Sequence, residues 1–171
     1  MPRVIGCIDG THITIKRPNL NDYPDEYINR HGNHSINVQA VCDARCIFLD
    51  IDCSWPGSVH DSRIFSNSDI CKKLTANTIN GILLGGSGYK LLPFVLTPYL
   101  TPNTAAQQIF NNSHRDTRVR IEMAFGQLNR RFASLQNPLR IKLEKCSSFI
   151  YCCFILHNIC KRWNDPNIID N

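Results

Sequence analysis

The chain has 171 residues, of which 43% are hydrophobic and 19% are charged, and its formal net charge is +5. This length and composition predict one soluble globular domain that buries its core without disulfides or structural metals. No apolar run reaches the roughly 18 residues of a membrane span, and the amino terminus predicts no signal peptide. The positive charge favours polyanionic partners only weakly, because a mildly basic domain with no nucleic-acid role has the same balance.

The nine cysteines form neither a disulfide framework nor a zinc site. Their number is odd, no Cys-x-x-Cys pair occurs, and no cysteine–histidine cluster has zinc spacing. Most of them lie inside apolar runs, which predicts reduced core thiols in a cytosolic or nuclear protein.

Three strands are predicted in the first third of the chain. Val4–Asp9 is a short apolar run that ends in a carboxylate, and residues 17–35 are a polar loop. Ile36–Cys42 alternates with a period of two, and Asp43–Arg45 makes the turn into a second hairpin arm. In that arm one face is formed by Ile47, Leu49, Ile51 and Cys53, which alternate with Phe48, Asp50 and Asp52. The two aspartates are predicted to be solvated.

Helices and one further strand follow. A helix begins at Ser58 or His60 and runs to about Leu74, and Gly81–Gly85 is a buried strand. The proline-punctuated residues 90–114 are predicted to be irregular.

Two helices complete the predicted domain. In Arg115–Phe132, apolar residues recur at helical spacing (Ile121, Phe125, Leu128, Phe132). Ser147–Trp163 is apolar on most sides, which is typical of a buried helix. Residues 1–163 are thus one domain with a mixed sheet and packed helices, and residues 164–171 are a tail.

Three carboxylates are candidates for a catalytic centre. Asp9 ends the first strand, Asp61 begins a helix, and Glu122 lies in the striped helix. Carboxylates that share two divalent ions can activate water and stabilise the leaving oxygen of a phosphodiester displacement, and oxygen ligands select Mg²⁺ or Mn²⁺.

Each carboxylate also has a simpler interpretation. Asp9 is equally suited to capping the segment after it, and Asp61 to a helix amino terminus. Glu122 is one helical turn from Arg118, as in a surface ion pair.

Four segments, in order along the chain, carry a family resemblance: Gly6–Ile13, Trp55–Phe65, Leu83–Tyr89 and Arg120–Leu128. They resemble the signature blocks of the PIF/Harbinger DDE superfamily, and within it the Harbinger transposase-derived nucleases. Ile155–Asn158 matches that family as well.

The resemblance implies an α/β, ribonuclease H-like fold and divalent-metal-dependent cleavage of DNA. The family's metal-binding, catalytic acids fall on Asp9, Asp61 and Glu122 here. The resemblance also implies a nuclear protein, with a cytoplasmic pool as a second location, and a separate Myb-like DNA-binding protein as partner.

The chain departs from the family pattern at Gly86. The block usually written Gly-Asp-Ser-Gly-Tyr is Gly85-Gly86-Ser87-Gly88-Tyr89, so a fourth acid is absent. The sequence therefore predicts cleavage that is severely reduced or absent. The alternatives are an inactive DNA- or protein-binding descendant of a transposase, and a defunct transposon fragment.

Basic and histidine side chains are secondary candidates. His12 and His60 are candidates for phosphate contact as well as for structural roles, and His157 is predicted to be a core histidine. Six cations are candidates for DNA phosphates or for a solvated basic surface: Lys16, Arg17, Arg118, Arg120, Arg130 and Arg131.

Overall fold

The structure is a computed structural model that describes residues 1–163, so the predicted tail at 164–171 lies outside the described residues. The strands are β1 (Val4–Thr14), β2 (Ser35–Cys42), β3 (Phe48–Pro56), β4 (Ile82–Gly85) and β5 (Val95–Leu96). The α-helices are α1 (Asp61–Asn67), α2 (Asp69–Thr75), α3 (Ala105–Arg131) and α4 (Leu143–Arg162).

The strands form one mixed sheet in the order β3-β2-β1-β4-β5. The β1–β2 and β2–β3 pairs are antiparallel, whereas β4 and β5 continue the sheet in parallel register with β1. This strand order, with helices on the sheet, is the ribonuclease H-like α/β fold that the sequence predicted. Among the described residues, no helix has the length and apolar character to cross a membrane.

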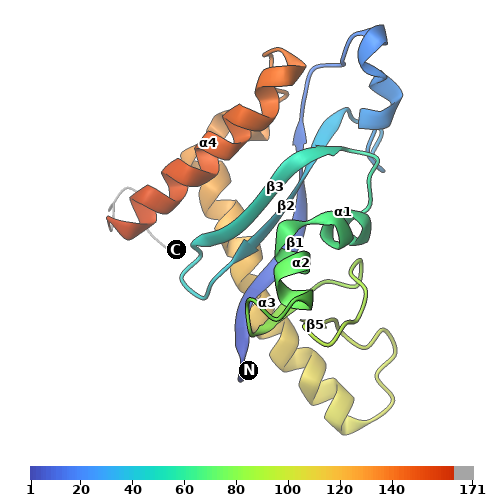
Figure 1. The fold of residues 1–171 in the computed structure, drawn as a ribbon, viewed down its shortest axis with the longest axis vertical. Coiled ribbons are helices and arrows are strands. Elements are labelled where there is room, and N and C mark those ends of the chain that lie inside the picture. Colours follow the sequence, from blue (N-terminus) through green and yellow to red (C-terminus); the bar gives the residue numbers. More distant parts are fainter. Residues whose placement is uncertain (164–171) are drawn as a thin grey trace.

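Helices cover both faces of the sheet (Figure 1). The long helices α3 and α4 pack on one face, and the short helices α1 and α2 pack on the other. All eight residues of β2 are buried, because this strand has neighbours on both sides and helices above and below.

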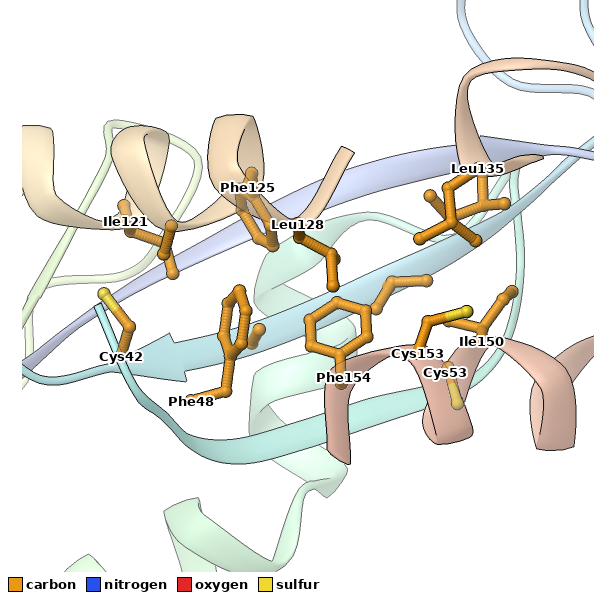
Figure 2. Packing of buried hydrophobic residues seen from close by; sticks show 14 of the residues in the cluster. Cys42, Phe48, Cys53, Ile121, Phe125, Leu128, Leu135, Ile150, Cys153 and Phe154 are labelled. Atoms are coloured by element: carbon orange, nitrogen blue, oxygen red, sulfur yellow. The ribbon is translucent and has the colours of Figure 1, made fainter. Parts of the chain in front are cut away.

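The larger core lies between the sheet and the pair α3 and α4 (Figure 2). At its centre the ring of Phe48 lies 4.5 Å from that of Phe154 and 5.8 Å from that of Phe125. Buried cysteines fill the space around these rings, as predicted, and all nine cysteines carry reduced thiols. Burial raises the pKa of Cys7 and of Cys53 to about 11, which keeps both thiols protonated at neutral pH.

Several predicted element boundaries are wrong. Helix α4 begins at Leu143 rather than at Ser147, and β5 lies inside the segment predicted to be irregular. The first strand continues to Thr14, because Thr11–Thr14 pairs with β2. The predicted single helix is broken at Ser68, whose hydroxyl accepts a hydrogen bond from the amide of Cys71 and so caps α2. Helix α3 begins at Ala105, inside the segment predicted to be irregular, where Thr104 and Gln107 form a capping box.

Two predicted burial patterns are also wrong. A register shift between Val41 and Cys42 places Phe48 in the core and leaves Leu49 53% exposed. Asp50, predicted to be solvated, is partly buried, and burial raises the pKa of its carboxyl. Helix α4 buries only one face, and its outer side leaves Tyr151 and Leu156 each 47% exposed, because no other described element covers that side.

Candidate active site

Asp9 lies in the middle of β1 rather than at the end of a strand. On one side β1 pairs with β2 along its whole length, and Asp9 is opposite Ala40. On the other side the parallel ladder with β4 ends at the pair Ile8–Gly85, so Asp9 is the first residue of β1 beyond that ladder. Its side chain is 26% exposed, and its Oδ1 accepts a hydrogen bond of 3.1 Å from the amide of Gly10. The Asp9 carboxylate thus belongs to the central strand of the sheet, just beyond the end of β4.

Asp61 approaches the same strand from α1. A Cβ at Gly10 would lie 2.5 Å from its Oδ1, so this close contact requires a glycine at position 10. The amide of Asn37 holds the carboxylate in place, donating to Asp61 Oδ1 at 3.0 Å and to the carbonyl of Val59 at 2.8 Å. Asp9 and Asp61 therefore flank one glycine of β1.

Glu122 is joined to Asp9 by the side chain of Arg118. On α3, Arg118 Nη2 donates to Glu122 Oε1, and Arg118 Nη1 donates to Asp9 Oδ2 at 2.8 Å. The ion pair between Arg118 and Glu122 considered from sequence is present, but the same guanidinium also binds Asp9. Burial raises the pKa of Asp9, and the charge of Arg118 is the strongest opposing influence.

Gly86 follows β4 and lies beside the strand that carries Asp9. A Cβ added at Gly86 would meet nothing within 4 Å, so the place of the expected fourth acid is open. The nearby Tyr89 is 5% exposed, and its hydroxyl has no hydrogen-bond partner among the described residues. Burial, and then the charges of Asp61 and Asp9, raise the pKa of Tyr89. Tyr89 belongs to the centre, although the sequence pattern assigned it no separate role.

The acidic side chains at this site do not form a metal-binding site in the arrangement that the structure shows. Within residues 1–163 no group of three or more His, Cys, Asp or Glu side chains is placed to hold an ion. Two of the predicted ligands are bound to Arg118, and Gly86 offers no ligand at all. The metal-binding role of Asp9, Asp61 and Glu122 stays a prediction.

The histidines separate into different environments. His12 is half-buried and its Nδ1 lies 3.1 Å from the hydroxyl of Ser35, while burial lowers its pKa. His60 is exposed and precedes α1 without a side-chain capping bond. His157 is fully buried, with Nε2 3.1 Å from the carbonyl of Cys46, which confirms it as a core residue. His114, not considered from sequence, is also buried and bonds the carbonyl of Leu96.

The predicted cations do not share one surface. Arg118 faces the acids, whereas Arg120 lines an open cavity of about 780 Å³ on the other side of α3. Three further cations line that cavity, from the β2–β3 turn and the end of α4: Arg45, Lys161 and Arg162. Lys16 and Arg17 are exposed beside a second cavity, of about 430 Å³, with Arg140 and Lys142. Arg130 is exposed outside both cavities.

Comparison with known proteins identifies the family. The profile of the DDE superfamily endonucleases matches residues 8–158. The mouse protein named "Putative nuclease HARBI1" is 39% identical over 163 residues, and the human protein of that name is 36% identical; each alignment covers 93% of this chain. "Protein ALP1-like" of Arabidopsis thaliana is 30% identical over 189 residues, covering 99% of this chain.

The chain spans 46% of the length of each of these three relatives, and no solved structure matches it. The matched region runs from the strand that carries Asp9 to Asn158, near the end of α4, and so includes all three predicted acids. The chain belongs to the DDE superfamily of endonucleases.

Proposed function

We propose that this domain acts on DNA as a DDE endonuclease whose cleavage is severely reduced or absent because Gly86 supplies no carboxylate. One observation carries the proposal. Gly86 follows the strand whose last residue pairs with Ile8, so it lies next to Asp9, the position from which a second strand-borne acid would meet the first. Endonucleases of this superfamily use divalent cations held by acidic side chains, and a missing acid leaves ion charge uncompensated.

The remaining acids support weak activity at most. Asp9, Asp61 and Glu122 are the catalytic and metal-binding residues that the family pattern assigns, with Mg²⁺ or Mn²⁺ as the ion. Mg²⁺ keeps several waters in protein sites, so a water can take the vacant position at the cost of affinity. Asp61, held next to Gly10 by Asn37, is the acid best placed to compensate in part.

The substitution Gly86→Asp directly tests whether the missing carboxylate at position 86 limits cleavage. We expect this substitution to raise Mn²⁺-dependent DNA cleavage by roughly tenfold or more, since restoring a group that binds or orients a metal has effects of about 10–100-fold. The position is open to a Cβ, which would meet no neighbour within 4 Å. Nicking of supercoiled plasmid measures the effect, with Gly86→Asn as the uncharged control. Equal and robust cleavage by the unaltered chain and by Gly86→Asp would refute the proposal.

A second function, DNA binding without cleavage, is favoured by the 780 Å³ cavity. Four cations line it, and among its described lining residues none is acidic. Cations grouped in this way neutralise phosphates and release counterions, which gives sequence-independent affinity for DNA.

The salt dependence of DNA binding tests this cavity. The double variant Arg120→Ala and Arg162→Ala should lower the slope of log K against log salt by about two, because each arginine neutralises about one phosphate. Lys72→Ala with Lys73→Ala removes the same charge from α2, on the opposite face of the sheet, and should leave the slope unchanged. Fluorescence anisotropy with a short duplex measures both. Equal slopes for the two double variants would exclude the cavity as the DNA-binding surface.

We also propose nuclear localisation, with a cytoplasmic pool, and a Myb-like DNA-binding protein as partner. The family resemblance supports both, since a DNA-cleaving domain gains target choice from a separate DNA-binding partner. Microscopy of the tagged protein and co-purification with a Myb-like protein test these two statements.

A further inference from the structure

The guanidinium of Arg118 occupies two of the three acids at the centre of the site. Nη1 binds Asp9 Oδ2 at 2.8 Å and Nη2 binds Glu122 Oε1, so one planar group joins β1 to α3. Arginine presents its donors in a rigid fork, which makes such paired contacts with carboxylates stronger than single ones. The side chains of Arg118 and Asp9 are 22% and 26% exposed, so water screens their contact less than that of a surface pair, whereas Glu122 is 54% exposed.

The local charge balance depends on this arginine. Burial disfavours the charged form of Asp9, and Asp61 adds a further negative charge nearby. Among the main influences on the Asp9 carboxyl, Arg118 is the cation, and it also contacts Asp9 Oδ2 at 2.8 Å. A cation is therefore needed at this point, and the chain supplies one from its own helix.

A divalent ion would need the same oxygens. Asp9 Oδ2 and Glu122 Oε1 are anionic donors of the kind that Mg²⁺ and Mn²⁺ prefer, and both are already bound by Arg118. A guanidinium and a divalent ion at one pair of carboxylates also repel each other. Occupation by one therefore excludes the other.

We propose that Arg118 is the resident cation of this centre and that a divalent ion binds only when the guanidinium leaves. This inference rests on the proposed function, because it concerns the same acids. The inference goes beyond the proposed function because it assigns to Arg118 the control of ion binding at the site. Arg118 holds Asp9 and Glu122 in position when no ion is bound, and its displacement is the cost that an entering ion must overcome.

The first test measures Mn²⁺ binding without DNA, so its result does not depend on cleavage. Arg118→Met keeps an unbranched apolar stem and removes the guanidinium fork. We expect its Mn²⁺ affinity, measured by calorimetry and by the Mn²⁺ paramagnetic resonance signal, to rise at least about tenfold. Arg120→Met, two residues away on the other side of α3, removes the same charge and should change the affinity less than about twofold. Unchanged or weaker binding by Arg118→Met would overturn the proposal.

A second measurement uses the unaltered chain and so does not depend on the variant folding. The ¹⁵Nη signals of Arg118 report whether its guanidinium is held, because paired contacts slow its rotation. Titration with Mg²⁺ should release these signals to those of a freely rotating arginine as the ion binds. Ion binding with the Arg118 signals still restrained would also overturn the proposal, while leaving the account of Gly86 intact.

Discussion

Phe154→Ala is expected to lower the free energy of unfolding by about 3–5 kcal/mol, the usual effect of deleting a buried phenyl ring. Phe154 is fully buried and connects α4 to the sheet, with its ring 4.5 Å from Phe48 and 6.5 Å from Phe125. Figure 2 shows these rings between α3, α4 and the strands, where removing one ring leaves a cavity that the rigid sheet cannot close. Urea unfolding followed by circular dichroism measures the loss.

Leu156→Ala is the matched control for this experiment. Leu156 lies two residues further along the same helix but is 47% exposed, so its truncation removes little buried area. We expect a loss below about 1 kcal/mol, within the range of surface substitutions. Similar losses for the two variants would mean that α4 does not pack on the sheet through the face described.

The order of the core elements followed from local patterns. The hairpin of β2 and β3 was predictable because its alternating residues are separated by a short turn, and β4 because its apolar run ends in glycines. The start of α3 was missed although Thr104 and Gln107 carry a capping signature, since the nearby prolines suggested an irregular segment. The half-exposed α4 was missed because burial depends on neighbouring layers, and residues 143–162 alone do not reveal which layers exist.

The candidate site was predictable only in its parts. Local sequence indicated Asp9, Asp61 and Glu122 as isolated acids, and the family blocks joined them. The spacing of four residues suggested an ion pair between Arg118 and Glu122. The contact of Arg118 with Asp9 spans 109 positions, and no local pattern encodes it. The role of Gly10 was equally hidden, because it depends on how closely α1 approaches β1.

We expect two features of the chain to lower the affinity of this centre for ions, and both lie beside the Asp9 carboxylate. Gly86 withholds a negative charge beside Asp9, and Arg118 adds a positive one. Gly86→Asp alone adds a further carboxylate beside Asp9. Arg118 is still present, and its guanidinium still neutralises part of the negative charge of these carboxylates. Removal of Arg118 alone frees Asp9 and Glu122 but still leaves position 86 without a ligand. Each substitution alone is therefore expected to raise the ion affinity of the centre only in part.

Gly86→Asp combined with Arg118→Met is expected to bind Mn²⁺ more tightly than the two single changes predict by addition. The coupling should be at least about 0.5 kcal/mol, because groups that share one site are not independent. Without metal the double variant should melt at a lower temperature than either single variant, since its acids have lost their cation. Added Mn²⁺ should restore the melting temperature through preferential binding to the folded state.

The control cycle pairs Gly86→Asp with Arg120→Met. Arg120 points to the other side of α3, so its loss changes the net charge equally without freeing a ligand, and the two effects should add. Calorimetry for the four proteins of each cycle gives both coupling energies. If the Arg118 cycle were additive like the Arg120 cycle, then position 86 and Arg118 would not act on one ion. The low ion affinity that we expect for the centre would then be attributed to Gly86 alone.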